Sequence, residues 1–294
     1  MKTEKSLLSK KQLLDIFVGH RVDSPFPGDW ESIFKGTGFE FWSLRELEPG
    51  DPIKNIDWKA RAKTGKYYVR EYLAESYYNM MILYDVSMSV AFGRKELLQA
   101  NIAASLAYSA VKSNNGCGMI QFADDVLLYI PPRMGVDHFM KIIRSIAEAR
   151  PVACRKTGMN RALTELVHQL PESLTFILSD FMFELDFSYT FHRTLHGTNK
   201  HEVKALQVLE ESEIRLPDGA KGCMDLYDYE SGQTLAVDLN KWRLYNCILQ
   251  RRLDRTRLDL ERAGIDCLVL TPADDFPGMI RDFINRNPLQ GTGQ

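Results

Sequence analysis

Residues 81–89 read MILYDVSMS, an apolar strand that runs directly into the pattern Asp-x-Ser-x-Ser. Alternate residues of an extended chain point the same way, so Asp85, Ser87 and Ser89 can converge on one point just beyond the strand. Oxygen ligands of this kind suit a hard cation such as Mg²⁺, which takes six oxygens and keeps several of its waters. The stretch therefore indicates a cation site. The alternative is an ordinary strand-to-helix turn, where Asp and Ser are also favoured.

Two further segments favour the cation site. Residues 173–180 read SLTFILSD, a second apolar strand that ends in Asp180. Residues 157–163 read TGMNRAL, which places Thr157 at the start of a helix. In an open α/β sheet, ligands bind beyond the carboxyl ends of the strands, at the point where the strand order reverses. Asp85 and Asp180 are therefore expected to share one crevice.

Together these positions resemble the metal-ion-dependent adhesion site of a von Willebrand factor A domain, with all five positions occupied. The resemblance implies hydroxyl ligands from Ser87, Ser89 and Thr157, and carboxylates, Asp85 and Asp180, that act largely through water. It also implies Mg²⁺ as the cofactor, with Mn²⁺ or Ca²⁺ as alternatives. The open position of such an ion binds an acidic side chain of a partner protein.

The composition of the 294 residues is that of an ordinary soluble protein, with 45% apolar and 26% charged residues. A formal net charge of -2 gives no global attraction to nucleic acid, so no DNA partner is expected. No apolar run is long enough to cross a bilayer, and residues 1–11 lack the apolar core of a signal peptide, which predicts a cytoplasmic protein. The five cysteines contain no Cys-x-x-Cys pair, which argues against a disulfide framework and a zinc site.

From about residue 80, short apolar runs alternate with helical periodicities, a pattern typical of a doubly wound, mainly parallel α/β sheet. The spacing of apolar residues predicts a helix at 94–113. The turn Ala123-Asp124-Asp125 predicts that the strand after it is antiparallel to its neighbour. The expected strands are 79–85, 117–122, 125–130, 174–179, 202–209 and 265–270.

Two segments interrupt this alternation. Residues 21–75 are rich in Gly, Pro and aromatics, and residues 210–238 contain two strand-like runs. Neither segment could bury much apolar surface alone, so the two are expected to pack together as a small β subdomain. The predicted organisation is an N-terminal helix or tail at 1–20, the β-rich segment at 21–75, the α/β domain at 76–287 with a hairpin insertion at 210–238, and a disordered tail at 288–294.

The N-terminal third carries a family signature, with GTGFEF at 36–41, LRELEPGDP at 44–52 and NIDWKARA at 55–62. It resembles the bacterial domain of unknown function numbered fifty-eight, whose members carry a von Willebrand A-like domain after this signature. Members are typically encoded beside a MoxR-type AAA+ ATPase, and many begin with two membrane-spanning helices. The resemblance implies a non-enzymatic adaptor in an ATPase-driven maturation or remodelling system, and leaves membrane-associated partners open.

Two other functions stay open. A strand-terminal Asp is also how aspartyl-phosphate enzymes present their nucleophile, which would make the protein a metal-dependent phosphohydrolase. Those enzymes usually need a second acid two residues on, where this chain has Ser87, which cannot act as a general acid at neutral pH. Residues 54–70 interleave basic and aromatic side chains as single-stranded nucleic-acid sites do, so RNA binding is the other alternative.

Overall fold

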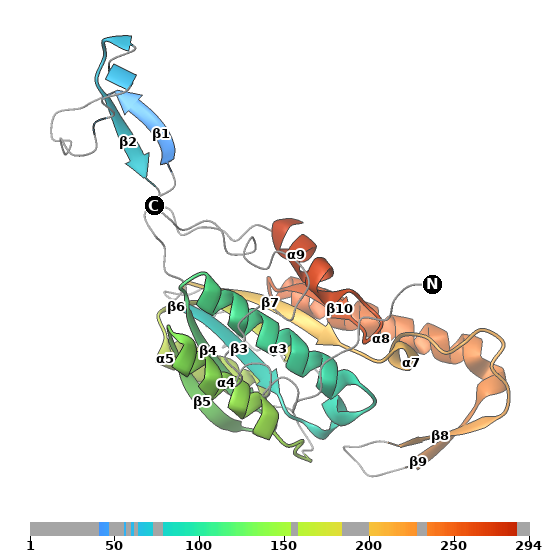
Figure 1. The fold of residues 1–294 in the computed structure, drawn as a ribbon. Coiled ribbons are helices and arrows are strands. Elements are labelled where there is room, and N and C mark those ends of the chain that lie inside the picture. Colours follow the sequence, from blue (N-terminus) through green and yellow to red (C-terminus); the bar gives the residue numbers. More distant parts are fainter. Residues whose placement is uncertain are drawn as a thin grey trace. The chain divides into compact units, whose positions relative to one another are not determined.

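A computed structural model describes residues 41–46, 56, 60–61, 64–72, 79–153, 158–183, 200–227 and 234–286 (Figure 1). The chain divides into two compact units, each treated by itself below. The smaller unit is Phe34–Tyr77, and the larger comprises Met1–Ile33 and Tyr78–Gln294.

The larger unit contains a six-stranded sheet in the order β10-β7-β6-β3-β4-β5. All neighbouring pairs are parallel except β4 and β5, which are antiparallel, as the sequence predicts. Taken in chain order, these six strands lie as 3-2-1-4-5-6, the order of a doubly wound α/β sheet. The strand order reverses between β3 and β6. The bounds are β3 Asn79–Asp85, β4 Gly116–Phe122, β5 Val126–Arg133, β6 Glu172–Ser179, β7 Lys200–Val208 and β10 Asp266–Leu270.

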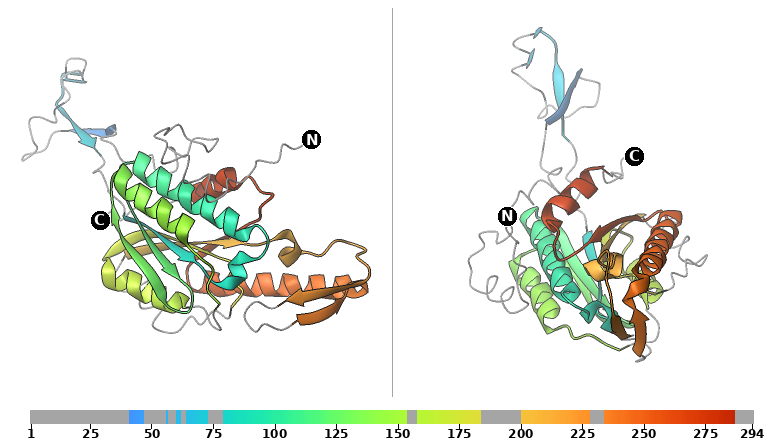
Figure 2. Two further views of the ribbon diagram at one scale, coloured as in Figure 1. Left: turned by 60° about the horizontal axis from the view of Figure 1, so that its bottom comes forward. Right: turned by 90° about the vertical axis from the view of Figure 1, so that its right-hand side faces the viewer.

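Helices cover both faces of this sheet, which explains why its central strands are continuous apolar runs. Helices α3 and α4 lie on one face, and α5 and α8 lie on the other (Figure 2). All seven residues of β4 are buried. The bounds are α3 Lys95–Lys112, α4 Val136–Glu148, α5 Met159–Gln169, α7 Glu211–Ile214, α8 Trp242–Arg262 and α9 Phe276–Arg286.

Helix α3 agrees with the predicted helix at 94–113 to within one residue at each end. Every residue from Leu98 to Ala110 is buried, so α3 is a core helix and not an amphipathic surface helix. Its buried surface includes Gln99, whose Nε2 donates to the backbone carbonyls of Asp85 and Leu178. Those bonds attach α3 to the carboxyl ends of β3 and β6.

Each of the two interrupting segments forms a hairpin of its own. In the smaller unit, β1 (Phe41–Glu46) pairs with β2 (Tyr68–Tyr72). In the larger unit, β8 (Cys223–Tyr227) pairs with β9 (Thr234–Asp238), as expected for the insertion. The strand pairing of the described residues does not join the two hairpins, and their packing as one subdomain stays a prediction.

The terminal segments predicted at 1–20 and 288–294 lie outside the described residues. Among the helices that are described, none is long and apolar enough to cross a lipid bilayer.

Candidate metal centre

The reversal of strand order places two aspartates at neighbouring strand ends. Asp85 is the last residue of β3, and Asp180 follows Ser179, the last residue of β6. The two strands are paired up to Tyr84 and Leu178. Both carboxylates are buried, with Asp85 1% and Asp180 0% exposed. The structure thus brings together the two acids that the sequence places at strand ends.

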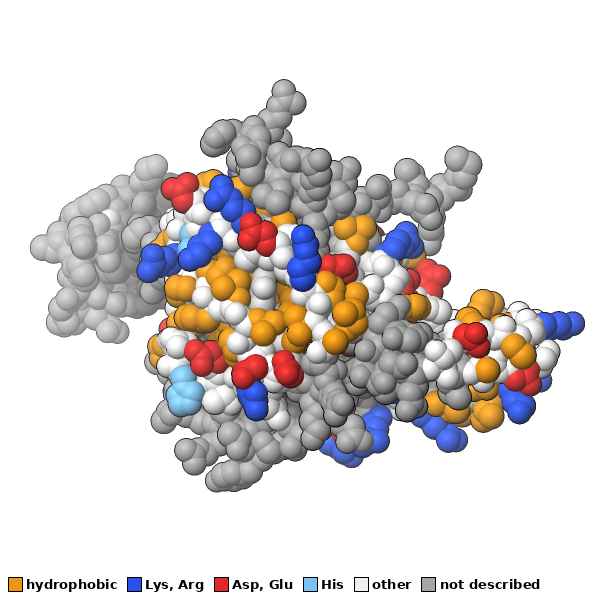
Figure 3. Space-filling model, turned by 90° about the horizontal axis from the view of Figure 1, so that it is seen from below, with side chains coloured by type: hydrophobic (Ala, Val, Ile, Leu, Met, Phe, Trp, Pro, Cys, Tyr) orange, Lys and Arg blue, Asp and Glu red, His pale blue; other side chains and the backbone are white. Residues whose placement is uncertain are grey.

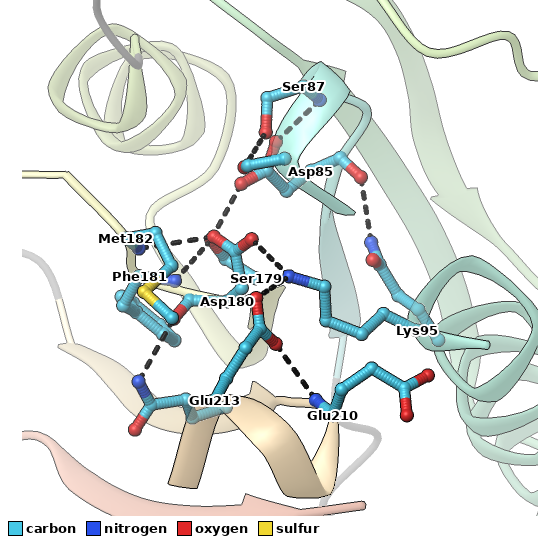
Figure 4. Close-up of polar contacts among 12 residues, drawn as sticks. Asp85, Ser87, Lys95, Ser179, Asp180, Phe181, Met182, Glu210 and Glu213 are labelled. Carbon is cyan, nitrogen blue, oxygen red and sulfur yellow. Dashed lines mark hydrogen bonds and ion pairs between the residues drawn. The ribbon is translucent and has the colours of Figure 1, made fainter. Parts of the chain in front are cut away.

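The Asp85 carboxylate is held by hydrogen bonds to both of its oxygens (Figure 4). The backbone N–H of Ser87 donates to Oδ1 at 2.8 Å, and Ser179 Oγ donates to Oδ2 at 2.6 Å. The pKa of Asp85 is raised to about 7, mainly by burial and also by the nearby Asp180 charge, while the hydrogen bonds from Ser179 and Ser87 oppose the shift. A cation beside Asp85 would therefore stabilise its ionised form.

The two serine hydroxyls of the Asp-x-Ser-x-Ser pattern lie side by side. Ser87 Oγ and Ser89 Oγ are 3.1 Å apart and share a hydrogen bond. Two oxygens that occupy adjacent corners of an octahedron around Mg²⁺ are about 3.0 Å apart, given its coordination distance of about 2.1 Å. Ser87 stands at the N-cap of a short 3-10 helix, Met88–Ala91, yet its side chain makes no capping hydrogen bond. This geometry does not support reading the pattern as a simple helix cap.

Thr157, the third predicted hydroxyl, lies outside the described residues, and its role stays a prediction. The described residues on either side of it are anchored close to the ends of β3 and β4. Val152 exchanges backbone hydrogen bonds with Val86 and Met88, and Gly158 N donates to the carbonyl of Ala123.

Asp180 has a partner that the sequence analysis did not single out. Lys95 Nζ donates to Asp180 Oδ2 at 2.9 Å and to Glu213 Oε1 at 2.7 Å, and the backbone N–H of Met182 donates to Asp180 Oδ1 at 3.1 Å. Both oxygens of Asp180 therefore already accept a hydrogen bond, and its contact with an ion through water stays a prediction. The sequence does contain a feature that could have drawn attention to Lys95, because a lysine in the first turn of a helix is unfavourable beside the positive end of the helix dipole.

The available ligand atoms fit a hard cation better than they fit zinc. Within the described ranges, no three His, Cys, Asp or Glu side chains form a group that could hold a metal ion. A cation at this edge would thus depend on the hydroxyls of Ser87 and Ser89, with Asp85 and Asp180 beside them. This all-oxygen set suits Mg²⁺, Mn²⁺ or Ca²⁺ and lacks the nitrogen and sulfur ligands that zinc prefers.

The family model described as "Protein of unknown function DUF58" matches residues 43–254. The chain belongs to the DUF58 family. This confirms the resemblance seen in the sequence signature. The uncharacterized protein Rv1480 of Mycobacterium tuberculosis is 28% identical to this DUF58 chain over 236 residues, which are 77% of this chain and 72% of that protein.

Two solved structures resemble this DUF58 protein weakly. BatB from Bacteroides thetaiotaomicron aligns with a TM-score of 0.47 and 13% identity, over 71% of this chain and 98% of that one. The VWA domain of SpRpn10 aligns with a TM-score of 0.37 and 15% identity, over 74% of this chain and all of that one. We assign the α/β architecture from the strand order of the sheet and not from these two structural alignments.

Proposed function

We propose that this DUF58 protein is a non-enzymatic adaptor that binds an acidic side chain of a partner through a divalent cation. The ion would be Mg²⁺, or alternatively Mn²⁺ or Ca²⁺, held by Ser87, Ser89, Thr157, Asp85 and Asp180. The observation that carries the proposal is the 3.1 Å approach of the Ser87 and Ser89 hydroxyls beside the buried Asp85.

The charges around the site support capture of a carboxylate. A bound cation would supply an open coordination position for an oxygen ligand. Ser87 and Ser89 contribute neutral hydroxyls, and the charge of Asp180 is offset by Lys95. Because few full negative charges lie against the ion, it would keep its attraction for a carboxylate from outside.

The partner we propose is a MoxR-type AAA+ ATPase, a client protein of such an ATPase, or both. This part of the proposal is supported by family membership alone, and family does not by itself determine function. The process would be protein maturation or remodelling.

A phosphohydrolase is less well supported by the geometry. Asp85 is 1% exposed and both of its oxygens accept hydrogen bonds, which is a poor presentation for a nucleophile. The ammonium group of Lys95 is enclosed by Asp180 and Glu213, so it is not free to bind a phosphate.

Binding of RNA by residues 54–70 is also less well supported. Lys66 forms an ion pair with Glu46, and the Arg61 guanidinium lies 4.1 Å from the ring centroid of Tyr67. These two basic groups therefore have partners within their own unit. Figure 3 shows one face of the described surface, on which acidic and basic side chains are intermingled around hydrophobic ones, so that face is not a basic surface.

The test is capture of partners from a lysate of the source bacterium on immobilised protein, with Mg²⁺ or with a chelator. Capture should require Mg²⁺, be abolished by Asp85→Ala and be weakened by Ser87→Ala. The exposed Asp282→Ala on α9 is the matched control and should capture as the wild type does. Capture that survives both chelation and Asp85→Ala would refute the proposal. Magnesium-dependent phosphatase turnover that Asp85→Ala removes would favour the enzyme.

A further inference from the structure

Lys95 is a charged side chain in a place that disfavours charge. It is the first residue of α3 and is 1% exposed. Removing an ammonium group from water costs several kcal/mol, and the positive end of a helix dipole adds to the penalty. The two carboxylates of Asp180 and Glu213, at 2.9 and 2.7 Å, offset this penalty (Figure 4).

The position of Lys95 is fixed from two sides. On one side it contacts Asp180 at the end of β6. On the other side the short helix α7 is attached to the start of α3 at two points. Glu213 accepts from Lys95 Nζ, and the Glu210 side chain accepts from the backbone N–H of Arg94. Glu213 also accepts from the backbone N–H of Glu210, which closes a capping box. Lys95 is therefore held in place, and it is not poised to swing towards a ligand.

The groups around the candidate metal centre are not balanced in charge. Asp85, Asp180 and Glu213 are three carboxylates, and Lys95 is the ammonium group that contacts two of them. Glu96 and Arg150 also line the hollow beside Asp85 and Ser87, and their opposite charges add no net charge. When all are ionised, two negative charges remain unbalanced, which is the charge that one divalent cation would neutralise. Without Lys95, three negative charges would remain, and an ion bound there would be over-neutralised.

We propose that Lys95 is a positioning residue that keeps the bound cation receptive to a partner's carboxylate. Lys95 holds Asp180 so that this carboxylate does not ligate the ion directly, and it offsets the charge of Asp180. The site therefore binds its metal less tightly than its carboxylates would allow, and the ion keeps an attraction for an external acid. This inference rests on the proposed function.

The test is calorimetric titration of the full chain with Mg²⁺ alone. Lys95→Met has nearly the volume of lysine and removes the charge, so it should bind Mg²⁺ about tenfold more tightly, a change of about 1.4 kcal/mol. Lys95→Arg keeps the charge and should stay within about threefold of the wild type. Glu213→Gln removes a negative charge and should bind Mg²⁺ several-fold more weakly. If Lys95 and its partners only maintain the structure, all three variants should bind Mg²⁺ more weakly than the wild type.

The double variant Lys95→Met with Glu213→Gln is the control for misfolding, because loss of one partner from a buried ion pair is strongly destabilising. It removes one positive and one negative charge and frees Asp180, so its Mg²⁺ affinity should equal or exceed that of the wild type. Weaker binding by the folded double variant, or by folded Lys95→Met, would overturn the role of Lys95. If the wild type itself shows no Mg²⁺ binding that Asp85→Ala removes, the proposed function fails instead.

Discussion

Asp85 is the residue whose charge decides the electrostatics of the site. Its carboxylate is buried near a second carboxylate, and its pKa is raised to about 7, mainly by burial. A carboxyl group with a raised pKa in the folded state favours folding when it is protonated. In the absence of a cation, this contribution to stability is therefore fully present below a pH of about 4 and is lost as the pH rises through about 7.

Asp85→Asn should remove this pH dependence. In chelator, the free energy of unfolding of the wild type relative to the variant should fall between about pH 4 and pH 7, by up to about 4 kcal/mol. Excess Mg²⁺ should stabilise the wild type at pH 8 and leave Asp85→Asn unchanged. Urea unfolding from pH 4.5 to 8, with and without Mg²⁺, measures both effects. Parallel pH profiles for the two proteins would show that Asp85 does not carry an unfavourable buried charge.

At this scale the sequence predicts the residues whose placement follows from local geometry. Strand alternation places Asp85, Ser87 and Ser89 together, and the end of the second strand places Asp180. Lys95 and Glu213 are different, because they meet across 118 positions of sequence and only the packing of α7 against the start of α3 brings them together. No local pattern contains that contact.

Among the elements, the buried parallel strands were predicted to within about two residues, because strands covered on both faces are continuous apolar runs. The antiparallel β5 was predicted to end at 130, but it extends to Arg133 through Pro131 and Pro132. It is one of the two edge strands of the sheet, and its ladder with β4 is irregular at the prolines, between the Cys117–Arg133 and Met119–Ile130 pairs. Proline is tolerated at such a position, because the regular hydrogen-bond ladder is already interrupted there. The burial of the polar residues of α3 could not be predicted, because it depends on what packs around the helix.

The start of helix α5 provides a test of how the elements support the site. A Cβ at Gly158 would clash with the backbone of Asp124 in the turn between β4 and β5. Gly158→Ala should therefore lower the free energy of unfolding by about 1–3 kcal/mol. It should also weaken Mg²⁺ binding, because Thr157 precedes this glycine.

Gly278→Ala in α9 is the control for that variant. Its Cβ would lie 3.1 Å from a side-chain oxygen of Asp275, which can move, and alanine favours a helix over glycine by up to about 1 kcal/mol. It should be as stable as the wild type or slightly more so, with unchanged Mg²⁺ binding. Denaturant unfolding and calorimetry measure both properties. If Gly158→Ala has the stability and the Mg²⁺ affinity of the wild type, the start of α5 does not support the site in the way we propose.

At the scale of the whole molecule, the described part of the site belongs to one compact unit. The six-stranded sheet, its described helices and Asp85, Ser87, Ser89, Asp180 and Lys95 all lie within residues 78–294. The sequence indicated the hairpin at 210–238 and a β-rich segment at 21–75, but it could not fix the pairing of β1 with β2 or the packing of the two segments, because strand propensity does not specify contacts between distant segments.

Residues 78–294 hold the whole six-stranded sheet and the described residues of the site, but not Met1–Ile33 of the same unit. We expect a fragment of residues 78–294 to unfold cooperatively and to bind Mg²⁺ with the affinity of the full chain. Circular dichroism during denaturation and calorimetric titration would measure the two properties. A fragment without a cooperative transition, or a folded fragment without Mg²⁺ binding, would show that residues 1–77 contribute to the domain or to its site.

The most direct test of the central claim is anomalous diffraction from crystals of the full chain grown with Mn²⁺. The account predicts one strong anomalous peak within about 2.2 Å of both Ser87 Oγ and Ser89 Oγ, with Asp180 still bonded to Lys95. The peak should be absent from Asp85→Ala crystals grown in the same way. A wild-type crystal with no peak at the serine pair, or with Mn²⁺ bound only at other carboxylates, would contradict the account.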